Sequence, residues 1–278
     1  MLEVLEAFAV IYEVGVPALL LLNLSQATLP QIFSLSLLVS ALAALIALIL
    51  GFVVFTAVRK RQRGDAVIAA WTSSYVNAGN LGIPLSAYVF GSTTEISALI
   101  LFQAAVMAPM GIAILNSATT PRPSPARQVV ALVTNPIIAA SVLGLIFAAV
   151  GLKIEGPVAD PLELLADLAI PTVLLAFGIS LTSGIGNAPP TNRIDLAITV
   201  FLKTLLMPVT AFAIARWGFG ADPEQVLLVT VLAALPSAQN INTYAAVYRR
   251  NESLARDATL ISTAVSVPII VSIVGILR

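Results

Sequence analysis

The sequence contains neither cysteine nor histidine among its 278 residues. Without thiols there is no disulfide or thiolate metal site, and without imidazole there is no histidine ligand, general base or activator of a nucleophile. We therefore expect no enzyme, no catalytic residue, no cofactor and no metal site. Of the intramembrane proteases, the aspartyl type is argued against because Gly-x-Gly-Asp is absent. A Ser/Lys pair at Lys203 stays open, although no serine lies within one turn of it.

Charged side chains are also scarce. They make up 10% of the residues, 14 basic and 14 acidic, whereas 59% of the residues are hydrophobic and the mean hydropathy is +0.99. Soluble domains carry about 25% charged residues, and a balanced charge gives no reason to expect nucleic acid as a partner. Apolar runs of roughly 20 residues are needed to cross about 30 Å of hydrocarbon. We predict an all-α membrane protein with about nine such segments, at residues 4–24, 32–58, 66–90, 95–117, 128–151, 160–183, 193–217, 223–248 and 254–277.

The basic residues other than Lys203 gather in alternate loops or at the segment ends next to them. One set of alternate loops contains ten of them: Arg59, Lys60, Arg61, Arg63, Arg122, Arg127, Arg193, Arg249, Arg250 and Arg256. The other loops and the C-terminus contain three: Lys153, Arg216 and Arg278. By the positive-inside rule we expect a multi-pass protein of the inner (cytoplasmic) cell membrane, with its N-terminus inside and its C-terminus outside. We interpret the cluster at residues 59–63 as a topology signal in contact with lipid headgroups, and Asp195 as a solvated residue near the cytoplasmic end of its helix.

Two apolar segments are interrupted at matching places. Residues 77–84 contain two Asn, two Gly and one Pro, a poor composition for an unbroken helix, and residues 235–242 resemble them. A shift of 160 positions brings residues 77–80 onto 237–240. Paired interruptions in corresponding places are the sequence sign of a transporter binding site.

The internal similarity extends beyond the interruptions. Residues 13–21 match 167–175 at an offset of 154, and residues 105–109 match 264–268 at an offset of 159. We therefore expect an N-terminal repeat of four helices at 1–118 and a C-terminal repeat of five at 127–278. Segments one to four match six to nine, which leaves the fifth segment without a partner, so we expect the first repeat to lack one helix, either genuinely or through a late start codon. Paired five-helix repeats would be inverted in the membrane because five is odd.

The interruptions supply the predicted binding site. A break within the membrane frees backbone N–H groups whose partial positive charge suits a carboxylate, and such breaks occur where protein or a watery cavity lines them. Asn side chains would add donors and acceptors, glycines would allow close approach, and prolines would fix where the helix breaks. The predicted set is Asn77, Gly79, Asn80, Gly82, Pro84, Pro236, Gln239, Asn240 and Asn242. The alternative is that these residues only form helix-packing kinks, since Gly and Pro are frequent in membrane helices.

Three charged residues within the apolar segments are candidates for charge or coupling roles. Lys203 lies near mid-membrane, where a lone charge costs roughly 2.5 to 3.5 kcal/mol. It would attract an anionic substrate or a carboxylate at long range, or would extend to the interface as a snorkelling side chain. Glu13 and Asp167 each lie four residues before a proline. They would be proton or cation sites, or would bond backbone groups freed by that proline, or would be exposed at a helix end.

The motif Asn-x-Gly-Asn-Leu-Gly-Ile-Pro-Leu, starting at Asn77, resembles the fourth-helix motif of the auxin efflux carrier family of PIN-like and malonate-permease-like membrane transporters. Further stretches resemble the family in the same order, namely Asn135-Pro136-Ile-Ile-Ala-Ala with Gly144, Pro171 through Gly178-Ile-Ser-Leu, Lys203-Thr-Leu-Leu-Met-Pro208 and Leu235-Pro236-Ser-Ala-Gln-Asn240. The resemblance covers nearly the whole chain, and the ordered set is more specific than any one motif.

The resemblance implies a ten-helix inverted repeat whose two broken helices cross at mid-membrane. It also implies a scaffold formed by the first, fifth and sixth segments, a moving transport part formed by the rest, and small organic anions as substrates. The expected function is a permease or efflux carrier that works by elevator-like alternating access, and homodimerisation stays open. Two alternatives remain: a sodium-coupled carrier of bile-acid-symporter type, although neither break contains a carboxylate, and a membrane receptor that binds without transport.

Overall fold

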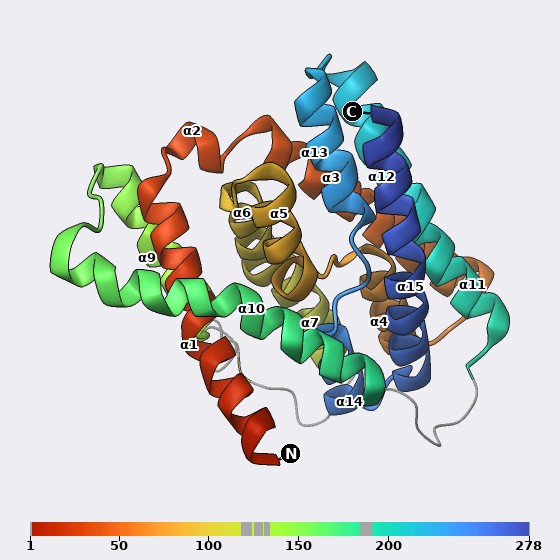
Figure 1. Ribbon diagram of the computed structural model, residues 1–278. Helices are drawn as coiled ribbons and strands as arrows, with labels where there is room; N and C mark the ends of the chain where they lie inside the picture. Colours follow the sequence, from red (N-terminus) through yellow and green to blue (C-terminus); the bar gives the residue numbers. More distant parts are fainter. Residues whose placement is uncertain (1, 118–123, 125–129, 131–133, 184–190, 278) are drawn as a thin grey trace. The chain divides into compact units, whose positions relative to one another are not determined.

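The computed structural model describes residues 2–117, 124, 130, 134–183 and 191–277, without the side chains of residues 2–13, 173–174 and 176–183 (Figure 1). Its regular elements within these ranges are helices, and the one extended pairing is an isolated bridge. Four helical stretches are long and apolar enough to cross a membrane: Leu29–Val58, Thr94–Asn116, Arg193–Gly218 and Glu252–Leu277. Shorter apolar helices lie at Val14–Gln26, Pro136–Val150 and Pro223–Ala234. The protein is therefore an all-α, multi-pass membrane protein, while the count of nine spans stays a prediction.

The chain forms two compact units, each of which is described by itself. Unit 1 comprises Met1–Leu37, Ala78–Pro109 and Pro123–Thr182, and unit 2 comprises Leu38–Asn77, Met110–Arg122 and Ser183–Arg278. Each unit draws on both predicted sequence repeats. The segments that the resemblance assigns to the scaffold fall in unit 1, together with the helices that follow the first break. The division into scaffold and transport parts stays a prediction, as do the repeat boundaries.

Unit 1 is built around the contact between α1 (Leu2–Gln26) and α9 (Pro136–Val150), which lie side by side (Figure 1). Small residues allow this close approach. A Cβ placed on Gly144 would lie 2.9 Å from the carbonyl oxygen of Leu21. The remaining helices of the unit are α2 (Leu29–Ile32), α5 (Ile83–Phe90), α6 (Thr94–Phe102) and α10 (Ala159–Ser183), with the π-helical turns η2 (Ala78–Gly82) and η3 (Gln103–Met107) and the 3₁₀ turn η4 (Gly156–Val158).

In unit 2, α15 (Glu252–Leu277) runs alongside α11 (Arg193–Phe201) and α13 (Pro223–Ala234), and it also contacts α4 (Arg63–Ser74) (Figure 1). The unit also contains most of α3 (Leu35–Val53) and of α7 (Ala108–Ser117), as well as α12 (Met207–Ala213) and α14 (Asn240–Tyr248). Its π-helical turns are η1 (Val54–Val58), η5 (Leu202–Leu206) and η6 (Ile214–Gly218).

Two stretches of unit 2 share their local structure at a spacing of 160 residues. Both ends of α13 lie 160 positions after the corresponding ends of α4, and η6 follows η1 at the same spacing. The turn after η1 is closed by the Arg61 N–H donating to the Phe55 carbonyl at 2.8 Å, and the turn after η6 by Ala221 donating to Ala215 at 2.9 Å. Such a correspondence is what an internal repeat requires, although the inversion of the repeats stays a prediction.

Candidate functional site: two helix breaks joined by a bridge

Both α4 and α13 end inside unit 2, and the chain then continues in extended conformation. Tyr75 follows α4 with φ −82° and ψ 114°, and Leu235 follows α13 with φ −53° and ψ 145°. At Leu235 the next residue explains the conformation, because Pro236 disfavours the helical region for the residue before it and has no N–H of its own to donate. All four of Tyr75, Val76, Leu235 and Pro236 are buried.

The two extended stretches pair with each other as a short antiparallel bridge between Val76 and Ser237. The backbone N–H of Asn77 donates to the carbonyl of Pro236 at 2.8 Å, and that of Ala238 donates to the carbonyl of Tyr75 at 3.0 Å. Each break therefore satisfies polar groups that the other leaves open, which matters because an unpaired backbone group in hydrocarbon costs several kcal/mol.

Hydroxyl groups complete the bonding around the bridge. The Ser237 hydroxyl donates to the carbonyl of Thr72 in α4 at 2.6 Å, and the Ser237 N–H donates to the hydroxyl of Ser262 in α15 at 3.1 Å. Ser262 in turn donates to the carbonyl of Thr259 at 3.1 Å. Ser237 and Ser262 are fully buried. Helices α4, α13 and α15 are thus tied together at the point where the first two end.

Lys203, in the π-helical turn η5, binds the C-terminal end of α13. Its ammonium donates to the carbonyl of Ala233 at 2.8 Å and contacts the sulfur of Met207 at 3.4 Å, and the side chain is fully buried. The carbonyl end of a helix carries partial negative charge, which a nearby cation stabilises. The snorkelling interpretation is wrong, because the ammonium lies inside unit 2 against a helix end.

Aromatic side chains pack beside the breaks. The ring centroids of Trp71 in α4 and Tyr244 in α14 lie 5.1 Å apart, with the planes inclined by 46°. A glycine makes room for this pair, because a Cβ on Gly111 would lie 1.9 Å from Cζ2 of Trp71. The hydroxyl of Tyr248 donates to Oδ1 of Asn116 at 2.7 Å, which links α14 to α7 a turn further on.

Five of the nine predicted binding residues lie in unit 2, around the bridge. Asn77 and Pro236 are buried within it, Gln239 directly precedes α14, Asn240 is the first residue of α14 and is exposed, and Asn242 is half-buried. Oδ1 of Asn242 is buried and has no hydrogen-bond partner among the described residues. The N-terminal end of α14 therefore presents amide side chains and the partial positive charge of a helix start.

The other four predicted residues lie in unit 1. Gly79, Asn80 and Gly82 belong to η2, and Pro84 lies in the first turn of α5. The expectation that Pro84 fixes the break is wrong, since α4 ends at Ser74 and the extended stretch precedes η2. The turn η2 leads directly into α5, and the chain stays helical through Pro84.

The carboxylates that were predicted as coupling sites lie in unit 1 on continuous helices. Asp167 is exposed on α10, which continues through Pro171, and the side chain of Glu13 in α1 lies outside the described residues. Their predicted roles stay predictions. Within the described ranges no three carboxylate, imidazole or thiol groups come together as a metal-binding cluster.

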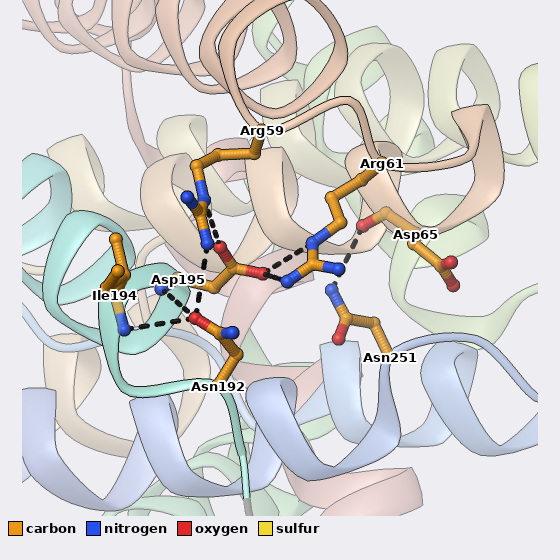
Figure 2. Close-up of polar contacts among 7 residues, drawn as sticks. All are labelled: Arg59, Arg61, Asp65, Asn192, Ile194, Asp195 and Asn251. Carbon is orange, nitrogen blue, oxygen red and sulfur yellow. Dashed lines mark hydrogen bonds and ion pairs between the residues drawn. The ribbon is translucent and has the colours of Figure 1, made fainter.

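Asp195 departs from its predicted solvated state, as Figure 2 shows. It is buried, with Oδ1 at 2.6 Å from Nε of Arg59 and Oδ2 at 2.7 Å from a terminal nitrogen of Arg61. Asn192 caps α11 by accepting from the N–H groups of Ile194 and Asp195, and it also accepts from Arg59 at 3.3 Å. The sequence alone could not reveal this contact, because Arg59 and Arg61 lie 136 and 134 positions before Asp195.

The chain is similar to a known protein family and to a known protein. The profile of the family described as "Membrane transport protein" matches residues 7–274, a range that includes both breaks and Lys203. A protein of Rhizobium meliloti (strain 1021) named "Putative malonate transporter" is 25% identical over 230 residues, which cover 79% of this chain and 70% of that protein.

Proposed function

Because the chain belongs to the membrane transport protein family, we propose that it is a secondary transporter that carries a small organic anion across the cytoplasmic membrane by alternating access. The substrate class is proposed from the chemistry of the breaks and from the name of the Rhizobium relative, which specifies malonate. The sequence has no Gly-x-x-x-x-Gly-Lys-Ser/Thr motif, so the proposed driving force is an ion gradient, the membrane potential or the substrate gradient.

The observation that supports this function best is the bridge between the two helix breaks. Within unit 2, α14 starts directly after the bridge with Asn240 and Asn242, and so provides amide donors together with the positive end of a helix. No acidic residue lies between Trp71 and Phe90 or between Val226 and Tyr248, so nothing in either break repels a carboxylate. In the proposed site, the side-chain amides of Asn240 and Asn242 bind the substrate carboxylate, while the binding role of Gly79, Asn80 and Gly82 stays a prediction.

Lys203 has an indirect part in this proposal. Its ammonium is bound to the Ala233 carbonyl, so it fixes the end of α13 and adds a positive potential to the site without direct contact with the substrate. The transport step is proposed as an elevator-like shift of the substrate-bearing part against a scaffold, with the protein's C-terminus on the outer side of the membrane.

The test is uptake of radiolabelled malonate and other small carboxylates into proteoliposomes that contain the purified protein. We expect saturable uptake that Asn240→Ala abolishes, because the exposed amide at the start of α14 is lost. Thr243→Ala is the matched control, since Thr243 is exposed on the same helix and should leave uptake unchanged. Unchanged uptake in Asn240→Ala would refute the site assignment.

The same vesicles separate this function from the two alternatives. Replacing external sodium by potassium should leave uptake intact, whereas a sodium-coupled carrier loses it. A receptor would bind carboxylates in detergent, and the ligand would stabilise it against heat, yet it would show no flux with any ion gradient.

A further inference from the structure

Three segments far apart in the sequence are tied together at one end of unit 2. Residues 59–65 follow α3 and η1, residues 191–195 begin α11, and residues 249–257 join α14 to α15. The links between them are Arg59 and Arg61 to Asp195, Arg59 to Asn192, Arg250 to Gln62 at 2.7 Å, Asn251 to the Asp65 carbonyl at 3.3 Å, and Thr191 to Asp257. The three segments therefore form one rigid, polar end of the unit.

This end carries a surplus of positive charge. Its segments contain eight basic residues and four acidic ones, and the internal ion pairs use only part of the basic set: Arg59 and Arg61 with Asp195, and Arg256 with Asp257. Four more basic side chains are exposed and make no hydrogen bond or ion pair with any described residue. We call these the basic surface: Lys60, Arg63, Arg193 and Arg249.

The backbone holds two of these residues in place. Lys60 and Arg249 have left-handed φ values of 52° and 50°, and each is followed by a residue whose N–H bonds back to the preceding helix. Arg61 donates to Phe55 at 2.8 Å, and Arg250 donates to Ala245 at 2.9 Å. The cations therefore project from fixed turns and not from a flexible tail, which lowers the entropy lost when a ligand is bound.

The basic surface lies at the ends of three apolar stretches that are long enough to cross a membrane. The apolar stretch Leu29–Val58 ends directly before Arg59, and the stretches Arg193–Gly218 and Glu252–Leu277 start at this same end of the unit. Exposed apolar side chains adjoin the cations, because Val58 is 69% exposed and Ile194 is 57% exposed. Phosphate-binding cations next to a lipid-facing apolar surface suit a ligand that has an anionic headgroup and acyl chains.

We propose that the basic surface binds the headgroup phosphate of an anionic phospholipid, whose acyl chains lie against Val58 and Ile194. This goes further than a topology signal, because it requires a discrete site with a preference for lipid charge. The Arg59–Asp195–Arg61 cluster positions this site (Figure 2). Its ion pairs fix the two loops that carry Lys60 and Arg193, and they neutralise Asp195, which would otherwise repel the phosphate. The proposal does not depend on transport activity.

The experiment titrates the purified full chain in detergent with phosphatidylglycerol. Native mass spectrometry measures the fraction of protein that has bound lipid, and so the affinity. Each basic residue near a charged lipid contributes about 1 kcal/mol, or roughly fivefold in affinity. Lys60→Gln/Arg63→Gln/Arg249→Gln should therefore weaken phosphatidylglycerol binding on the order of a hundredfold at low salt. Raising the salt concentration should weaken wild-type binding more than binding to this variant.

Two variants serve as controls. The charge-preserving Lys60→Arg/Arg63→Lys/Arg249→Lys should retain binding within about threefold, because the site needs positive charge more than a particular group. Arg216→Gln removes an exposed cation at the other end of the Arg193–Gly218 stretch and should retain full affinity. Should the triple glutamine variant fail to fold, the single Lys60→Gln change, with its expected fivefold loss, replaces it.

Three outcomes would overturn the proposal. Phosphatidylcholine binding as tightly as phosphatidylglycerol would show that charge is not recognised. Equal competition by glycerol phosphate would show a phosphate site that has no use for acyl chains. Unchanged phosphatidylglycerol affinity in a folded triple or single glutamine variant would place the lipid elsewhere.

Discussion

The ammonium of Lys203 donates a 2.8 Å hydrogen bond to the carbonyl of Ala233, the penultimate residue of the interrupted helix α13. A single buried charge and a helix end that lacks partners for its carbonyls are both unfavourable in an apolar interior. Together they offset each other, because the cation lies at the negative end of the helix. The position of Lys203 is thus explained by the break in a different helix.

Replacing this lysine should separate stability from activity. Lys203→Met removes a charge whose burial costs roughly 2.5 to 3.5 kcal/mol on insertion scales, and leaves one carbonyl whose loss of a partner costs about 1 to 3 kcal/mol. We therefore expect an unfolding midpoint in detergent close to that of the wild type, with uptake of the substrate carboxylate reduced at least about tenfold, equivalent to about 1.4 kcal/mol. The control is Leu205→Met, on an exposed side chain in the same turn.

A midpoint lowered by much more than the carbonyl penalty would contradict this balance. It would mean that the bonded ammonium contributes more to folding than its desolvation costs. Uptake at the wild-type rate would instead remove Lys203 from the proposed site.

The serines around the bridge should be energetically coupled. Ser237→Ala loses the bond to the Thr72 carbonyl, and Ser262→Ala loses the acceptor for the Ser237 N–H. Each should lower the free energy of unfolding by about 1 to 3 kcal/mol, because both groups are buried and an orphaned partner is left behind. The double variant should cost less than the sum, since both bonds hold the same stretch of chain.

Denaturant unfolding followed by circular dichroism measures these changes. Ser272→Ala is the control, because the Ser272 hydroxyl is exposed and bonds only within its own helix, to Pro268. Costs that add up fully would mean that the two serines act independently and do not hold the bridge as one unit.

The sequence predicted the interruptions well because their signals are local. Asn, Gly and Pro in an apolar segment disfavour a helix whatever surrounds them, and the match at an offset of 160 appears again in the bounds of α4 and α13. Pro84 misled the prediction of the break, since a proline fits the first turn of a helix as well as it ends one. Only the structure shows which role applies.

The contacts that hold the site together could not be predicted. Nothing in the sequence pairs Ser237 with Thr72, or Arg61 with Asp195, because these contacts depend on how helices pack across more than a hundred residues. Asp195 illustrates the limit: a carboxylate in the first turn of a helix is usually solvated, and only the loop after η1 makes it buried and paired.

Gly111 should be intolerant of any side chain. A Cβ there would lie 1.9 Å from Cζ2 of Trp71, whose ring also packs on Tyr244. Gly111→Ala would therefore force α4 and α7 apart or push the indole ring out of its position. We expect a loss of about 1 to 3 kcal/mol or more in the free energy of unfolding. Gly275→Ala, which meets no atom within 4 Å, should not lower it.

A compensating substitution makes this prediction sharper. Trp71→Phe removes the part of the indole that the new methyl group would strike. The double variant Gly111→Ala/Trp71→Phe should therefore lose less free energy of unfolding than the two single variants lose together. If Gly111→Ala unfolds at the wild-type midpoint, α4 and α7 are less closely packed than the structure places them.

The ion pairs of Asp195 should contribute measurably to stability although they lie near one end of unit 2. Asp195→Asn keeps the size of the side chain but removes the charge that Arg59 and Arg61 share, at 2.6 and 2.7 Å. A buried pair broken on one side costs about 3 to 5 kcal/mol. The two arginines are 23% and 37% exposed, so solvent screening lowers our expectation to about 1 to 3 kcal/mol.

Glu224→Gln, on an exposed carboxylate in the first turn of α13, is the control and should change the stability by less than about 0.5 kcal/mol. Thermal unfolding at low and high salt measures the effect, and the difference between wild type and Asp195→Asn should narrow as salt screens the pairs. Equal midpoints at low salt would mean that hydration of Arg59 and Arg61 fully replaces their lost interaction with the carboxylate charge.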